Sequence, residues 1–255
     1  MPGTVIETLS DPDALAARAV GLLVNAARFS IERRGRFTLV LAGGSTPERT
    51  YRLLARREHS ASIDWSRVFL FFGDERFVPA EDAASNFGMV RRSLLAHLPI
   101  PAEHVFPMLT STATADAAAL QYGATISSFF RQPIETVPAP RFDLVLLGLG
   151  EDGHTASLFP GALATREERR WVLSSPPGTL PPPVDRITLT FPIINSAGHA
   201  LFLVAGAKKA GVLKEVLERQ SPRDRFPASG VRLTDGDVTW LIDREATSLL
   251  SENKR

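Results

Sequence analysis

The sequence contains no cysteine, and this absence excludes several kinds of site at once. Disulfides, thiolate zinc sites, iron–sulfur clusters and a cysteine nucleophile all require that residue. A chain without disulfides fits a reducing compartment. The first 19 residues also lack the basic start and apolar core of a signal peptide, because Asp11 and Asp13 interrupt them early. We therefore expect a cytoplasmic protein.

An excess of charge of either sign is also missing. The chain has 29 Lys and Arg residues against 28 Asp and Glu residues, and its basic pairs are scattered among acids, so it shows no footprint of nucleic-acid binding. No uninterrupted apolar stretch reaches the roughly 18 residues that a membrane span needs. With 44% hydrophobic residues in 255, the chain can bury a sizeable core. We expect neither nucleic acid nor membrane as a partner.

Short apolar runs alternate with segments of helical periodicity along the chain. The runs rich in Val, Leu, Ile and Phe lie at 37–41, 68–72, 142–147, 187–191, 200–204 and 238–242. Such alternation predicts an α/β fold of three layers, with a Rossmann-like, mostly parallel sheet and helices on both faces. We expect one domain over residues 1–255. The Pro-rich stretches at 133–140 and 176–183 are interpreted as surface loops within it, and the second could also form a lid.

The first segment with chemical potential covers residues 39–48, where a strand runs into two glycines and a helix start. Ser45 and Glu48 have the spacing of a capping box, and Pro47 suits the first helical turn. The backbone N–H groups of this turn, its hydroxyls and the positive end of the helix dipole can bind a phosphate. The residues concerned are Gly43, Gly44, Ser45 and Thr46. Since many strand-to-helix turns contain such residues, this motif alone leaves phosphate binding open.

The second segment, 71–79, is a nearly all-apolar strand that ends in Asp74, Glu75 and Arg76. Ligands of parallel sheets gather at the carboxyl ends of strands, and an Arg guanidinium matches a phosphate or carboxylate. The alternative is a surface salt bridge among these three side chains. A helix is expected to start at Ser85 and Asn86.

The third segment, 142–161, is a strand ending in glycines that are followed by Asp152 and His154. A histidine just past a strand end, beside an acid and several glycines, is poorly placed for a core, which favours a chemical role. Glycines at 148, 150 and 153 would let a substrate approach the backbone closely.

Two other interpretations of this segment are weaker. Residues 148–153 form a G-x-G-x-x-G pattern, but two acids would lie where a dinucleotide pyrophosphate must sit, and the run at 171–174 lacks the acid that would hold a ribose. Asp152 and His154 could ligate a metal, yet no other histidine stands in ligand spacing. We therefore predict no metal and no cofactor.

Taken together, these motifs closely resemble the 6-phosphogluconolactonase family, and the likeness extends from residue 43 to residue 243, including 182–190 and 206–210. The resemblance implies the fold shared with glucosamine-6-phosphate deaminases. It implies that the glycine turn at 43–46, Arg76 and Lys209 face a sugar phosphate, with Lys208 outside the turn, and that His154 is the base. We count Asp74, Gly150 and Gly153 among the substrate-binding residues.

The expected activity is hydrolysis of 6-phospho-D-glucono-1,5-lactone to 6-phosphogluconate in the oxidative pentose phosphate pathway. Neutral His154 would take a proton from water, and Asp152 would orient it. The partner would be the small-molecule lactone alone, with the oligomeric state left open and a monomer slightly favoured.

One alternative is a glucosamine-6-phosphate deaminase. However, the Glu that assists ring opening in Asp-Gly-His-Ile-Ala-Phe-Asn-Glu-Pro of deaminases is replaced here by Phe159, and Arg76 stands where deaminases tend to have Tyr. The other alternative is a non-catalytic sugar-phosphate sensor, for which we see no DNA-binding segment before the first strand.

Overall fold

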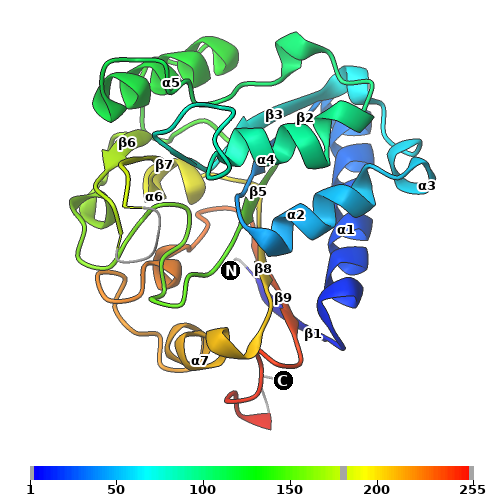
Figure 1. The fold of residues 1–255 in the computed structure, drawn as a ribbon, viewed down its shortest axis with the longest axis vertical. Helices are drawn as coiled ribbons and strands as arrows, with labels where there is room; N and C mark the ends of the chain where they lie inside the picture. Colours follow the sequence, from blue (N-terminus) through cyan, green and yellow to red (C-terminus); the bar gives the residue numbers. More distant parts are fainter. Residues whose placement is uncertain (1–2, 179–182, 253–255) are drawn as a thin grey trace.

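A six-stranded parallel sheet forms the centre of the computed structural model, which describes residues 3–178 and 183–252 (Figure 1). In spatial order its strands are β1 (Thr4–Leu9), β9 (Asp237–Asp243), β8 (His199–Val204), β5 (Leu144–Leu147), β2 (Phe37–Leu41) and β3 (Val68–Phe72). Each neighbouring pair is parallel. Every residue of β2 and β5 is buried, as expected for inner strands covered on both faces. The predicted mostly parallel sheet is confirmed.

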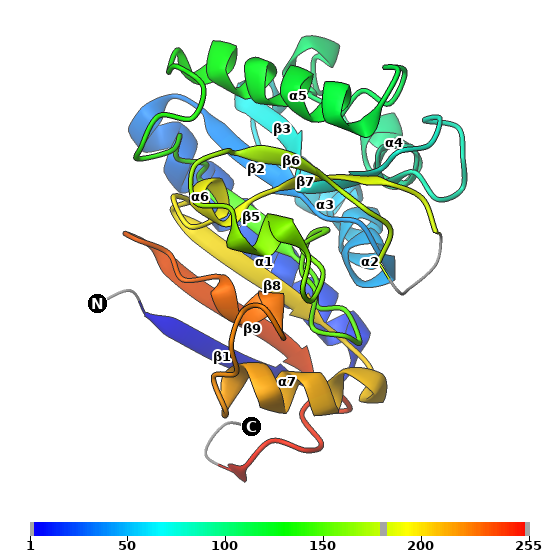
Figure 2. The same cartoon turned by 90° about the vertical axis from the view of Figure 1, so that its left-hand side faces the viewer.

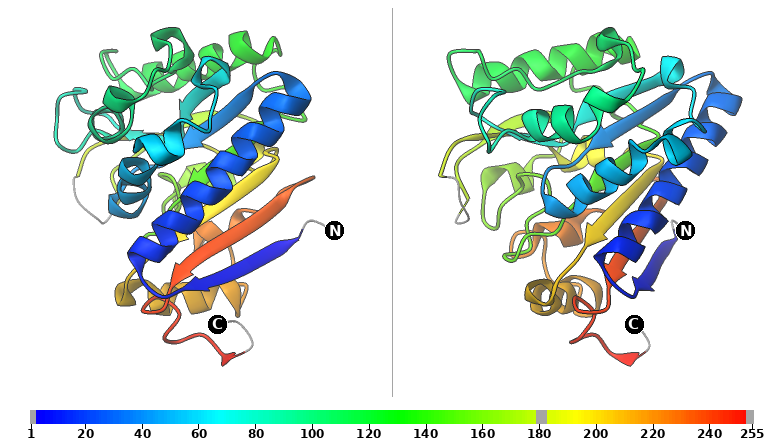
Figure 3. Two further views of the ribbon diagram at one scale, coloured as in Figure 1. Left: turned by 90° about the vertical axis from the view of Figure 1, so that its right-hand side faces the viewer. Right: turned by 45° about the vertical axis from the view of Figure 1, so that its right-hand side comes forward.

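Helices cover this sheet on both sides. They are α1 (Pro12–Arg34), α2 (Ser45–Leu54), α3 (Arg57–Ser60), α4 (Asn86–Ser93), α5 (Ala115–Phe130), α6 (Phe191–Ile194) and α7 (Ala210–Leu217). Figures 1 and 3 show α1 and α2 on one face of the sheet and α7 on the other. The predicted three layers are therefore present.

Helix α1 shows how local sequence sets these elements. Asp11 caps its start by accepting hydrogen bonds from the N–H groups of residues 13 and 14, and Gly35 ends it with a positive φ of 72°. The 23-residue helix is long and apolar enough to cross a membrane by length and composition. In this fold its buried side chains, Leu15, Ala16, Ala19, Val20, Leu23 and Ala27 among them, cover the sheet as those of a core helix do.

A second, antiparallel sheet was not predicted. It contains β4 (Asp74–Arg76), β7 (Arg186–Leu189) and β6 (Val172–Ser175), in that order. Figure 2 shows this small sheet over one face of the parallel sheet. The placement of the apolar run 187–191 in the parallel sheet is therefore wrong. All four residues of β7 are buried, so its apolar pattern matches that of a parallel strand although its partners run the opposite way.

The chain's two tyrosines hold the carboxyl ends of β2 and β3. The Tyr51 hydroxyl accepts from the N–H of Ala42 at 2.9 Å and donates to its carbonyl at 2.8 Å. Tyr122 does the same for Phe72, at 2.8 and 3.3 Å. Both phenols are buried, and burial raises the pKa of each. These neutral hydroxyls satisfy backbone groups where the strand ladders end.

We expect Tyr51→Phe to lower the free energy of unfolding by about 1–3 kcal/mol, because it leaves a buried N–H and C=O without their partner. Urea denaturation followed by fluorescence measures this loss. The exposed Phe29, changed to Leu, is the control and should have little effect. Equal stability of Tyr51→Phe and the unmodified chain would show that water replaces the hydroxyl.

Candidate active site

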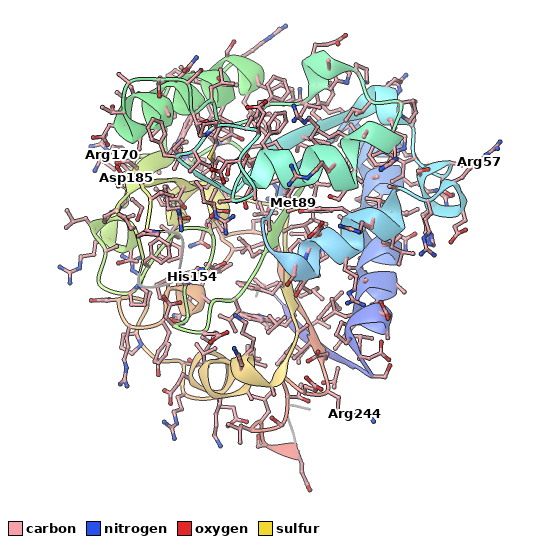
Figure 4. The ribbon with its side chains drawn as sticks, viewed as in Figure 1. Arg57, Met89, His154, Arg170, Asp185 and Arg244 are labelled. Carbon is pink, nitrogen blue, oxygen red and sulfur yellow. The ribbon has the colours of Figure 1, made fainter. Side chains whose placement is uncertain are left out.

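A pocket of about 250 Å³ opens at the carboxyl ends of β2, β3, β5 and β8. Its lining combines the three segments singled out in the sequence with the turn after β8. The polar and glycine residues concerned are Gly43, Gly44, Ser45, Thr46, Gly73, Asp74, Arg76, Asn86, Gly148, Gly150, His154 and Lys209. Figure 4 shows His154 on the loop that follows β5, between the ribbons of α7 and of the small sheet. Segments that are far apart in the chain thus contribute to one cavity.

The glycine turn differs from the predicted capping box. Gly44 is the N-cap, with a φ of 101° that only glycine adopts readily, and no side chain caps the helix. Ser45 is therefore the first helical residue, and Glu48 pairs with Arg52 at 2.7 Å instead of reaching back. The capping-box prediction is wrong because the helix begins one residue earlier than expected. The first-turn N–H groups, left without a side-chain cap, can bind an anion.

Successive side chains of a strand point to opposite faces, and this separates the three charged residues of β4. Asp74 and Arg76 line the pocket, whereas Glu75 points away and is buried. Glu75 accepts 2.7 Å hydrogen bonds from the N–H groups of Arg76, Asn86 and Phe87. Burial raises the pKa of Glu75, although these donors act in the opposite direction. Glu75 therefore does not take part in a surface salt bridge with Asp74 and Arg76, and that alternative is wrong for this residue. Its carboxylate instead binds backbone N–H groups at the start of α4.

The predicted helix start at Ser85 is confirmed. The Ser85 hydroxyl accepts from the N–H of Gly88 at 3.0 Å, and α4 begins at Asn86. The Asn86 side chain then lies in the pocket wall, a position that sequence reasoning did not predict. Its only signal in the sequence was its place directly after the cap.

A second arginine lies beside Arg76. Arg186 stands opposite Arg76 in the β4–β7 ladder and is 3% exposed. Burial lowers the pKa of Arg186, and the positive charge of Arg76 adds to this effect. Sequence reasoning did not select Arg186, although a charged residue opening an apolar strand was a usable signal. Arg186 does not line the pocket, but its positive charge beside Arg76 favours an anion there.

His154 and Asp152 form a hydrogen-bonded pair within one tight turn. The imidazole Nδ1 lies 2.5 Å from Oδ1 of Asp152, and the backbone N–H of His154 donates to the same oxygen at 3.1 Å. Burial opposes ionisation of Asp152, but the hydrogen bond and charge of His154 outweigh it and hold the pKa of Asp152 below its usual value. With Nδ1 engaged by the carboxylate, Nε2 is the nitrogen left to accept a proton.

Glycines shape this turn. A Cβ on Gly150 would lie 2.1 Å from His154 Nδ1, and Gly153 has a φ of 87° with Phe226 2.6 Å from where its Cβ would be. Gly150 lines the pocket together with His154, while Asp152 and Gly153 do not. Asp152 therefore contacts the imidazole from outside the cavity, and Gly153, predicted to bind substrate, does not line the pocket.

The turn after β8 separates two lysines. Lys209 lines the pocket and is half-buried, whereas Lys208 is exposed. Burial lowers the pKa of Lys209, and the charges of Glu151 and Asp152 oppose this. The structure thus places Lys209, and not Lys208, at the cavity.

The structure bears on the two weaker interpretations of residues 148–154, a dinucleotide-binding turn and a metal site. Residues 148–153 do not open a helix, since the next helical element is a short 3-10 turn at Leu163–Arg166, so a dinucleotide pyrophosphate would lack its helix N-terminus. Within 3–178 and 183–252, no group of three or more His, Asp or Glu residues is arranged to hold a metal ion. Half of the suggested lid at 176–183 lies outside the described residues, which exclude 179–182.

A parallel sheet with a helix start that lacks a side-chain cap, cations and a paired imidazole at the strand ends is typical of an α/β enzyme that acts on a small anionic substrate. The family model described as glucosamine-6-phosphate isomerases/6-phosphogluconolactonase matches residues 10–240. The chain belongs to that family.

Several relatives are similar over nearly the whole chain. The 6-phosphogluconolactonase of Mycobacterium bovis is 37% identical over 249 residues, which cover 96% of this chain and 98% of that protein. The probable chloroplastic 6-phosphogluconolactonase 4 of rice, Oryza sativa subsp. indica, is 37% identical over 250 residues, covering 95% of this chain and 76% of its own. The solved 6-phosphogluconolactonase of Trypanosoma brucei superposes with a TM-score of 0.85 at 32% identity, covering 98% of this chain and 100% of that one.

We expect Gly43→Ala to lower the free energy of unfolding by about 1–3 kcal/mol, the usual cost of forcing extra atoms into a packed site. The new methyl would lie 2.0 Å from Oδ1 of Asn86. Chemical denaturation measures the change. Gly211→Ala is the matched control, because a Cβ there meets nothing within 4 Å and the residue is helical. If both variants were equally stable, the contact between Asn86 and the glycine turn would not be tight.

Proposed function

We propose that this chain hydrolyses 6-phospho-D-glucono-1,5-lactone to 6-phosphogluconate, the lactonase step of the oxidative pentose phosphate pathway. The observation that carries the proposal is that the imidazole of His154 lines the same cavity as Arg76, Lys209 and the glycine turn. A base and a phosphate site are thereby available to one small molecule. The lactonase names of the relatives at 35–37% identity support the same substrate.

The phosphate would bind at the glycine turn, between the first N–H groups of α2 and the side chains of Arg76 and Lys209. Arg76 is held in place by a 2.6 Å hydrogen bond from Nη1 to the Ala84 carbonyl. Arg186, the residue opposite Arg76 in the β4–β7 ladder, adds positive charge nearby. Binding energy from a phosphate far from the reacting carbonyl fixes the lactone for attack along one line.

His154 would activate the water. Its Nε2 takes a proton as the water oxygen bonds to the lactone carbonyl carbon, giving a tetrahedral oxyanion. When the ring C–O bond breaks, the same proton passes to the departing ring oxygen, so no covalent enzyme intermediate is needed. Asp152 keeps the proton of the neutral ring on Nδ1 and balances the transient positive charge. Backbone N–H groups of a glycine-containing turn, or a nearby cation, stabilise the oxyanion.

The deaminase alternative is less well supported. Phe159 occupies the position of the deaminase carboxylate, is 8% exposed and packs against the imidazole with ring centroids 5.0 Å apart. A hydrocarbon ring there cannot assist sugar ring opening. We also propose that the protein is cytoplasmic and monomeric; a chain without cysteine suits a reducing compartment. The measurement that tests the activity is acid release from the fresh phosphorylated lactone, corrected for spontaneous opening, beside ammonia release from glucosamine 6-phosphate.

His154→Ala should lower kcat about a hundredfold or more while KM stays within a few-fold, the usual scale for losing a general base. Steady-state kinetics on the phosphorylated lactone measure both constants. The exposed His97, changed to Ala, is the control. An unchanged kcat in His154→Ala would reject this histidine as the base.

Arg76→Ala should raise KM for the phosphorylated lactone with a smaller change in kcat, because its guanidinium contributes to ground-state binding of the phosphate. The comparison substrate is glucono-1,5-lactone without phosphate, whose kcat/KM should change little. Equal losses on both lactones would show that Arg76 does not contact the phosphate.

A further inference from the structure

Asp74 presents an unusual combination, since it is a carboxylate in the wall of a pocket proposed to bind a dianion. Both of its oxygens are already engaged by the protein. The Ser157 hydroxyl donates to Oδ2 at 2.6 Å, and Asn86 Nδ2 donates to Oδ1 at 3.2 Å. Asn86 Nδ2 also donates to the Asp74 carbonyl at 2.9 Å. These bonds direct the carboxylate oxygens toward two neighbouring segments.

The first of these segments carries the base. Ser157 follows His154 by three residues and is 1% exposed. Its backbone N–H donates to Oγ1 of Thr188 at 3.1 Å, and Thr188 is the residue opposite Asp74 in the β4–β7 ladder. Ser157 therefore connects the loop of His154 to one residue pair of the small sheet. Its hydroxyl binds Asp74, and its N–H binds Thr188.

The second segment carries the anion-binding turn. The amide of Asn86 fills the space beside Gly43, where the Cβ of any other residue would lie 2.0 to 2.6 Å from its Oδ1, Cγ and Nδ2 atoms. Asn86 is 2% exposed, and its own N–H is fixed by Glu75 at 2.7 Å. Asn86 thus connects Asp74 to the glycine turn with little room to move.

We propose that Asp74 is a positioning residue that, through Ser157 and Asn86, fixes the separation between the phosphate-binding turn and His154. This inference rests on the proposed lactonase function. A lactone held by its phosphate reaches the imidazole only if that separation matches the distance from phosphate to carbonyl carbon. Since a displacement of about 1 Å can reduce a rate about a hundredfold, the contacts of Asp74 select lactones that carry a phosphate at the right distance.

Ser157→Ala tests the proposal, because it removes one hydroxyl that does not line the pocket. We expect kcat on the phosphorylated lactone to fall tenfold to a hundredfold. The rate on unphosphorylated glucono-1,5-lactone should stay within about twofold, since that substrate is not anchored at the turn. The preference for the phosphorylated substrate should therefore fall by the same factor as kcat.

Two further variants complete the design. Ser157→Cys keeps the size and a weaker donor, so its kcat should lie between those of Ser157→Ala and the unmodified chain, and it serves if Ser157→Ala does not fold. Ser30→Ala is the matched control, a 3% exposed serine whose hydroxyl bonds Arg34 near the end of α1. Its kinetics should be unchanged.

Equal losses on both lactones, no loss on either, or a rise in KM with unchanged kcat would each overturn the positioning role. Failure of the proposed function would look different, because the unmodified chain itself would then not accelerate opening of the phosphorylated lactone.

Discussion

Parallel pairing of β2 with both β3 and β5 is the constraint on which the site depends. Because the three strands point the same way, the turns after Leu41, Phe72 and Leu147 open at one edge of the sheet. Each turn contributes a different chemical group, namely backbone donors, a guanidinium and an imidazole. No single segment could provide all of them, since the conformations that expose N–H groups at a helix start differ from the tight turn that holds the imidazole.

The sequence predicted the elements that are buried on both faces. The observed bounds of β2 and β3 equal the predicted 37–41 and 68–72, since strands covered on both faces appear as continuous apolar runs, even where, as for β3, the strand lies at an edge of the sheet. The edge strand β1 was missed because all six of its residues are partly or fully exposed. The three charged residues of β4 do not have a strand pattern either. The direction of β7 could not be predicted, because burial alone determines its composition.

At the site, residues that carry chemistry were visible in local motifs, and residues that hold them in place were not. His154 and Arg76 stand out next to glycines or at strand ends, whereas Lys209 was selected through the family resemblance. The contacts of Asn86 and Arg186 depend on segments that meet only after folding, so no local spacing encodes them. The wrong capping box at Ser45 has a similar origin. A one-residue shift in where a helix begins costs little locally and is settled by the conformation of Gly44.

The imidazole and its carboxylate are separated by a single residue, and the same Oδ1 also accepts the backbone N–H of His154. Such a pair is assembled by a few backbone torsions and does not wait for distant parts of the chain to dock. Because both groups lie in the same tight turn, their mutual alignment does not depend on how the two sheets pack against each other. The alignment of the proposed base with its carboxylate thus depends on local backbone conformation, whereas its distance from the glycine turn depends on contacts between distant segments.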